Sequence, residues 1–218
     1  QELEYDGAMD WGWAFPVTRE YDEVLGDFKD FGKDRNDLKT KSVDKETSMA
    51  EKILLPALVS KRGDLIAHGF ETGAQHNLVL IFRLGYDITL NSREYGPEME
   101  RFKAYARDFM AYAYEQSYAR RIDVLEKEVK ATEKDLKQNE NKIDGLEKKV
   151  ANLNKKISQE SDQIKIDEFK SEIVTNLADR DALQETLPGL KAQIDNLTSN
   201  ADKLRTESHQ YQVAIADL

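Results

Sequence analysis

The feature that most constrains the fold is a heptad repeat of apolar residues between Ile122 and Ile157. If Ile122 is assigned to heptad position a, the following a positions are all aliphatic, whereas half of the d positions are polar. A seam sustained over this many heptads is typical of a coiled coil, in which a and d side chains pack on a second helix. The predicted seam comprises Ile122, Leu125, Val129, Leu136, Asn139, Ile143, Leu146, Val150, Leu153 and Ile157.

A second seam runs to the C-terminus, two residues out of register with the first. Its members include Ile166, Phe169, Ile173, Leu183, Leu187, Leu190, Ile194, Leu197, Leu204, Tyr211, Ile215 and Leu218. The polar stretch SQESDQIK, residues 158–165, separates the two seams. A phase slip inside a polar stretch is expected where a helix reverses direction. The sequence therefore predicts an antiparallel helical hairpin with arms of about 98–157 and 165–218 and a turn near 158–165.

The charges of the two arms favour pairing within one chain. Residues 127–156 contain nine Lys and six acidic residues, a net charge of +3. Residues 158–218 contain six basic and twelve acidic residues, a net charge of −6. Opposite signs favour pairing between the arms over self-pairing of either arm, although each exposed ion pair contributes little stability.

Pro188 and Gly189 interrupt the second arm, because proline removes a backbone donor and glycine is a weak helix former. They mark either a kink near 188 or the true reversal of a much longer first helix; the seam keeps its phase across them, which favours the kink. With a turn centred near residue 162, Asn139 falls opposite residue 185 and is predicted to bond backbone groups released by Pro188. By the same register Arg180 is predicted to meet Asp144.

The N-terminal part has the pattern of a small α+β domain. A short strand is predicted over 13–17, followed by a helix that Thr18 would cap. An edge strand is predicted in DLKTKSVD, residues 37–44, and AEKILLPALV, residues 50–59, reads as a short helix or an edge strand. Two strands joined around Gly73 form a predicted β-hairpin, and the apolar run of 78–82 indicates a central strand covered on both faces. The helix after Thr18 is expected on one face and the following helix on the other.

The following helix has a clear predicted start at Gly96-Pro97, where proline and nearby acids suit a first turn. Its apolar stripe, Met99, Phe102, Ala106, Phe109 and Ala113, is expected to pack on the sheet. The predicted fold class is therefore α+β: an N-terminal domain with an antiparallel sheet and covering helices at 1–96, followed by a coiled-coil hairpin at 97–218.

Composition and motifs exclude several function classes. The net charge of −10 argues against nucleic acid as a partner, and no apolar run reaches the roughly 20 residues of a membrane span. The chain has no cysteine, and its three histidines lie outside any dense ligand motif, so neither a metal nor a cofactor is predicted. Without phosphate-loop or hydrolase motifs, the sequence does not predict an enzyme. Trp11 and Trp13 are interpreted as packing residues, with an interaction surface as the alternative.

The architecture favours a structural or adaptor subunit within a multi-protein assembly, docked through its N-terminal domain, with the hairpin as a spacer or protein-interaction arm. Two alternatives remain: a periplasmic holdase-type chaperone, or a small-ligand-binding domain with a helical element for homo-oligomerisation. The latter would need a pocket lined by Trp11, Trp13 and the tyrosines. A first residue of Gln1 rather than Met is expected after signal-peptide removal and favours an exported, periplasmic or cell-envelope protein; a trimmed chain would leave the cytoplasm open.

Overall fold

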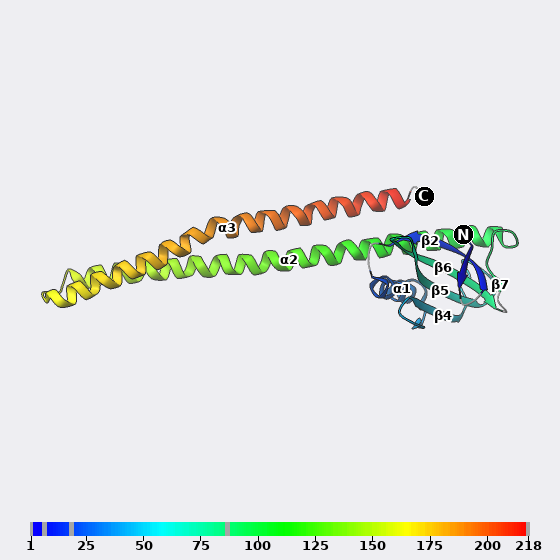
Figure 1. Ribbon diagram of the computed structural model, residues 1–218, viewed down its shortest axis with the longest axis horizontal. Helices are drawn as coiled ribbons and strands as arrows, with labels where there is room; N and C mark the ends of the chain where they lie inside the picture. Colours follow the sequence, from blue (N-terminus) through cyan, green and yellow to red (C-terminus); the bar gives the residue numbers. More distant parts are fainter. Residues whose placement is uncertain (1, 6–7, 18–19, 86–87, 217–218) are drawn as a thin grey trace. The chain divides into compact units, whose positions relative to one another are not determined.

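An antiparallel sheet with covering helices is followed by a long helical hairpin, which confirms the predicted fold class (Figure 1). The computed structural model describes residues 2–5, 8–17, 20–85 and 88–216. Residue contacts group the chain into two units. The sheet unit comprises Gln1–Ser117 and Ser208–Leu218, and the hairpin unit comprises Tyr118–Glu207. The sequence-based division at 96 and 97 follows element type, whereas this grouping divides both long helices.

The sheet contains seven antiparallel strands among the described residues. They are β1 (Glu2–Tyr5), β2 (Ala8–Pro16), β3 (Lys41–Ser42), β4 (Thr47–Ile53), β5 (Gly63–Thr72), β6 (Gln75–Gly85) and β7 (Ile88–Thr89). Their order is β1-β2-β6-β5-β4-β3, and β7 also pairs with β6. The β5–β6 turn follows the predicted signal: Thr72 pairs with Gln75, and Gly73 has a left-handed φ of 63° that glycine adopts without a steric penalty.

Two further sequence expectations are resolved around these strands. The polar stretch at 37–44 forms the two-residue edge strand β3, as predicted. The ambiguous 50–59 stretch completes β4, and the chain then leaves the sheet in a turn at Pro56. Helix α1 spans Tyr21–Asn36; Thr18, its expected cap, lies outside the described residues.

The main core lies on one face of the sheet and is formed with both α1 and the start of helix α2 (Gly96–Ile157). Residues 78–82 of β6 are fully buried, as predicted for a central strand. The expectation that α1 and α2 would cover opposite faces is wrong, because side chains of both helices join the same cluster as Leu78, Leu80 and Phe82. The other face carries a smaller cluster of Ile66, Val79 and Ile81.

The predicted stripe of α2 lies in this main core: Met99, Phe102, Ala106, Phe109 and Ala113 are all buried. Aromatic rings dominate the contact. Phe109 lies 5.8 Å from Phe15, 5.6 Å from Phe28 and 5.4 Å from Phe31, measured between ring centroids. Rings at these separations and tilts gain stability beyond the apolar area that they bury.

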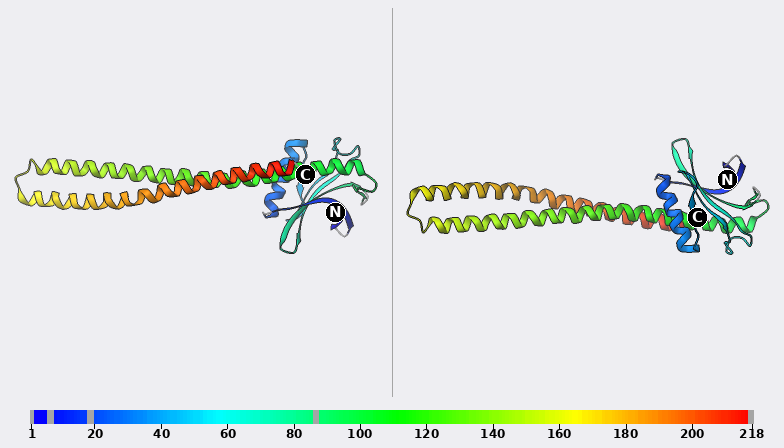
Figure 2. Two further views of the ribbon diagram at one scale, coloured as in Figure 1. Left: turned by 90° about the horizontal axis from the view of Figure 1, so that it is seen from above. Right: turned by 90° about the horizontal axis from the view of Figure 1, so that it is seen from below.

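In the hairpin unit, α2 ends at Ile157 and helix α3 (Gln163–Ala216) begins after a five-residue connection. The two helices lie side by side in both views of Figure 2. The connection is fixed by side-chain caps: the Asp162 carboxylate accepts the Ile164 N–H at 3.0 Å, and the Glu160 carboxylate accepts the N–H groups of Ser161 and Asp162. The reversal therefore lies at 158–162, inside the predicted turn, and Pro188 lies within α3.

Among the described residues, none of the helices combines the length and apolarity that crossing a lipid bilayer requires.

Candidate interaction sites

The residues of the predicted seam line one face of each hairpin helix, but most are only half-buried. Ile143, Leu153 and Leu204 are the members buried to 9% exposure or less within the hairpin unit. Two members, Tyr211 and Ile215, belong to the sheet unit instead. The Tyr211 ring stacks on Tyr114 at 5.4 Å with an interplanar angle of 7°. Tyr211 remains 47% exposed, so its role there is ring stacking on Tyr114 rather than burial between helices.

Three further seam residues are buried: Thr132, Asn176 and Ala201 are 6%, 8% and 3% exposed. Thr132 is one of the polar d positions of the first heptad repeat. Asn176 and Ala201 were not among the predicted positions of the second seam, although heptad spacing alone would have found them: Asn176 lies three residues after Ile173, and Ala201 lies four residues after Leu197. The seam is therefore longer and more polar than its aliphatic members indicate.

Asn139 is half-buried and lies close to the interruption in α3, as predicted, but its hydrogen bond differs from the expected one. Its side-chain amide donates to the Thr186 hydroxyl at 3.0 Å. That hydroxyl donates in turn to the Leu183 carbonyl at 2.7 Å. The partner is thus a side chain one residue away from the predicted opposite position, and not a backbone group released by Pro188. The predicted register needs a shift of about one residue.

The predicted pairing of Arg180 with Asp144 is wrong. Arg180 binds its neighbour Asp181 at 2.5 Å, and Asp144 binds Lys148 at 2.6 Å along α2. Both ion pairs lie within their own helices and not across the seam. Between the two arms, Glu126 binds Arg205 at 2.5 Å. This ion pair between the two arms lies near the end of the hairpin unit that is remote from the turn.

An open groove runs between the hairpin helices and is lined by Lys142, Gly145, Leu146, Lys149, Asp179, Ala182 and Leu183. Leu146 and Leu183 are seam residues, and Gly145 and Ala182 leave them less covered because their side chains are absent or small. The lysines stand on α2 and the aspartate on α3, so the rim has opposite charges on its two sides.

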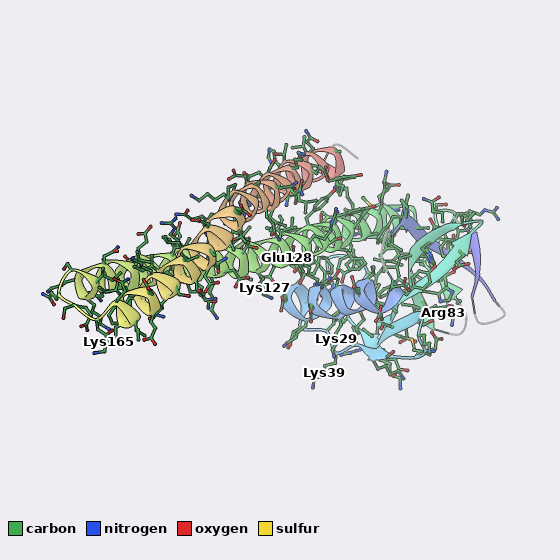
Figure 3. All side chains as sticks on the ribbon, turned by 60° about the vertical axis from the view of Figure 1, so that its left-hand side comes forward. Lys29, Lys39, Arg83, Lys127, Glu128 and Lys165 are labelled. Carbon is green, nitrogen blue, oxygen red and sulfur yellow. The ribbon has the colours of Figure 1, made fainter. Side chains whose placement is uncertain are left out.

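A cation–π contact also joins the two helices near the turn, where Lys156 lies over the Phe169 ring at 5.5 Å. The position of Lys165, which follows the turn, is labelled in Figure 3.

Trp11 and Trp13 are half-buried and pack against the main core, so the packing interpretation describes their surroundings well. Cations cover both rings: Arg93 lies 5.8 Å from the Trp11 ring and Lys103 lies 5.4 Å from the Trp13 ring. Trp13 Nε1 is buried and has no hydrogen-bond partner within the described part of the chain. A shallow depression in the same unit is lined by Phe15, Pro16, Val17, Val24, Ala113, Tyr114 and Ser117, and neither tryptophan lines it.

Titratable groups of the sheet unit make two small clusters. His68 Nδ1 and Thr47 Oγ1 lie 3.0 Å apart, and burial lowers the pKa of His68 while Asp44 and Glu46 partly oppose this shift. His76 lies 3.3 Å from the Tyr21 hydroxyl and 3.5 Å from the Glu71 carboxylate. Burial is the main cause that raises the pKa of Tyr21, and burial also raises that of Tyr105. Within the described residues, no group of three or more His, Cys, Asp or Glu side chains is placed to hold a metal ion.

In the hairpin turn, the backbone N–H groups of Asp162 and Ser161 hold the pKa of Glu160 below its usual value, with Lys165 as a smaller contribution.

Comparison with known proteins adds no assignment for these sites: no family model and no curated protein matches the chain.

Proposed function

We propose that the protein is a non-enzymatic structural or adaptor subunit that docks through its sheet unit and uses the hairpin as a spacer or protein-interaction arm. The observation that carries this proposal is the distribution of apolar residues on the hairpin. Its aliphatic seam packs between two helices of the same chain, and its remaining large apolar side chains are scattered, for example Val124, Ile164 and Val174. Scattered apolar residues are normal on a solvated surface and do not form a stripe for further helices.

Length supports the same proposal. Helix α2 has 62 residues and α3 has 54. At 1.5 Å per residue they extend about 93 and 81 Å, far more than a helix needs to cover a small sheet. A long two-helix arm with polar outer faces supplies reach and stiffness. The same polarity disfavours the holdase and homo-oligomerisation alternatives, because both need continuous apolar surface to hold clients or a second bundle.

The proposed location is the periplasm or cell envelope, and the cytoplasm is the alternative; cell fractionation with a specific antibody decides between them. The proposed partners are proteins. Because the arm would act by its length, the decisive variant is a shorter hairpin with an intact seam. Deleting residues 122–135 together with 190–203 removes two heptads from each helix, keeps the heptad phase of both and leaves Asn139 and residues 176–189 in place. The arm shortens by about 21 Å.

The test is affinity purification of the tagged chain after mild crosslinking, with quantitative mass spectrometry. An adaptor retains a small set of proteins in fixed stoichiometry, and the shortened hairpin loses the partner bound through the arm while keeping the partner bound by the sheet unit. The control variant keeps the full length of the hairpin and replaces the exposed Ser171 and Ser199 with Ala. Many substoichiometric proteins would instead indicate a holdase, and recovery of the chain alone, or an identical set after shortening, would contradict the proposal.

A further inference from the structure

Polar residues in the seam gather in the middle of the hairpin. Towards the turn, the seam contains Leu153, Ile157, Phe169 and Ile173, and at the other end Thr132 is a polar residue among aliphatic ones. Between these sections lie Asn139 on α2 and Asn176 and Arg180 on α3. Asn176 is 8% exposed, and its Nδ2 atom is buried without a hydrogen-bond partner among the described residues. A buried amide group without a partner destabilises the closed seam, because it keeps its desolvation cost and gains no bond in return.

The backbone of α3 is weakened in the same section. Pro188 has no N–H and so leaves the Gln184 carbonyl without its bond from the fourth residue along. Gly189 follows, and nothing lies within 4 Å of the position that a Cβ atom would occupy there. Thr186 donates to the Leu183 carbonyl, a type of side-chain bond that bends helices. Figure 1 shows α3 changing direction within its orange section. Proline and serine or threonine back-bonds are recognised causes of such bends.

One cross-arm hydrogen bond spans this section, from the Asn139 amide to the Thr186 hydroxyl. It ties the weakened part of α3 to α2, which continues as an unbroken helix past Asn139. A groove lined by Gly145 on α2 and Ala182 on α3 lies beside this section, and a similar groove lined by Leu125 and Leu204 lies farther along the hairpin. What sets the section apart is that the weak seam and the weak backbone coincide in it.

We propose that the section of α3 from Asn176 to Gly189 is a flexible joint, and that the Asn139–Thr186 hydrogen bond restrains it. The part of α3 on the turn side of this joint changes direction relative to the rest of α3, because the weak seam of this section parts from the unbroken α2. Such a joint lets a stiff arm adjust to its target without unfolding. The proposal concerns the hairpin alone and stands whether or not the adaptor function is correct.

The chain lacks cysteine, so two introduced cysteines can carry spin labels at chosen positions. The test pair is Ser171→Cys with Ser199→Cys, two exposed positions on the outer face of α3 on either side of the joint. The matched control pair is Lys127→Cys with Lys155→Cys, which are exposed on the outer face of α2 at the same spacing and cross no proline. Both pairs span about 42 Å if the helix is straight.

Pulsed electron–electron distance measurements on the full chain should give a distribution for α3 about twice as broad as that for α2. Adding Pro188→Ala and Gly189→Ala should narrow the α3 distribution to the control width, and adding Asn139→Ala should broaden it further. A narrow α3 distribution at a shortened mean distance would establish a fixed bend and overturn the proposal. So would a broad distribution that the Pro188 and Gly189 replacements leave unchanged. An unchanged width of the α3 distribution after Asn139→Ala would show that the Asn139–Thr186 hydrogen bond does not restrain the joint.

Discussion

The sheet unit and the hairpin unit bury their apolar residues in different ways. In the sheet unit, Phe28, Phe82, Phe102 and Phe109 are fully buried in one cluster that joins two helices and the sheet. In the hairpin unit, Ile143 and Leu153 stay 8% and 4% exposed, and most other seam residues are only half-buried. A three-dimensional core surrounds each side chain with partners, whereas two helices cover a side chain from one direction only.

This difference has a consequence for how each unit tolerates polar groups. The hairpin seam contains Thr132 and Asn139, whose side chains donate to the Glu128 carbonyl and the Thr186 hydroxyl, and Asn176, whose buried Nδ2 atom has no partner among the described residues. Each layer of the seam also depends mainly on the adjacent layers, as in other quasi-one-dimensional structures. A defect in the seam is therefore local, whereas a defect in the aromatic core affects every element that meets there.

The largest expected effect comes from Phe109→Ala, because this ring contacts three others in the core. It should lower the free energy of unfolding of the sheet unit by about 3–5 kcal/mol. Ile143→Ala should lower that of the hairpin by only about 2 kcal/mol, since the seam residues on either side of Ile143 are only half-buried. Both tryptophans lie in the sheet unit, so their fluorescence reports its unfolding, while far-UV circular dichroism is dominated by the long helices.

The control for this pair is Glu115→Ala, an exposed position on α2 that should change stability by less than about 0.5 kcal/mol. Equal losses for Phe109→Ala and Ile143→Ala would contradict the distinction between a core and a seam.

Two glycines, Gly63 in the sheet unit and Gly145 in the hairpin unit, should respond to replacement by alanine with opposite effects on stability. At Gly63 a Cβ atom would lie 2.3 Å from the Arg83 carbonyl oxygen and 2.5 Å from the Phe82 ring. Gly63→Ala should therefore destabilise the sheet unit by about 1–3 kcal/mol. At Gly145 nothing lies within 4 Å of the corresponding position. Gly145→Ala should stabilise the hairpin by about 0.5–1 kcal/mol through helix propensity. Urea unfolding followed with both probes measures each change.

Gly26, in helix α1, has equally open space and serves as the control within the sheet unit, where Gly26→Ala should also stabilise. If Gly145→Ala destabilised the hairpin, the added methyl group would clash with a neighbouring group, which contradicts the open space found around this position.

The sequence predicted the fold class and the hairpin well because periodicity and turn chemistry act locally. The heptad repeat, the polar turn and the Gly73 hairpin are each visible within a short window. The arrangement of α1 and α2 on one face was missed, because an apolar strand such as 78–82 indicates cover on both faces without identifying the covering element.

The contacts of polar seam residues were harder to predict. Asn139 was correctly associated with the interrupted part of α3, but its Thr186 partner depends on a one-residue register and on a side-chain rotamer. Arg180 pairs with Asp181 and Asp144 pairs with Lys148, and heptad spacing does not predict which of several nearby charges a long, exposed side chain will bind. Asn176 was overlooked because a polar residue at a seam position gives no apolar signal.

The smallest expected effect distinguishes the units by pH. Burial lowers the pKa of His68 below its ordinary value of 6.5 in the folded sheet unit. Below pH 6.5 the unfolded chain therefore binds a proton that the folded chain does not, so stability is fully present above that pH and is lost as the pH falls through the lowered pKa. Because the ring is only half-buried, solvent screening should keep the loss below about 1 kcal/mol.

In the hairpin, Glu160 also has a lowered pKa, but its stabilising effect is present above the ordinary carboxylate pKa of 4.5 and is lost only as the pH falls below that value. Lowering the pH from about 7 to 5 should therefore weaken the fluorescence-monitored transition slightly and leave the helical transition unaffected by Glu160. His68→Gln should flatten the pH dependence of the fluorescence-monitored transition in this range, and Glu160→Gln should leave that pH dependence unchanged. An equally steep profile in His68→Gln would assign the acid sensitivity of the sheet unit to another group.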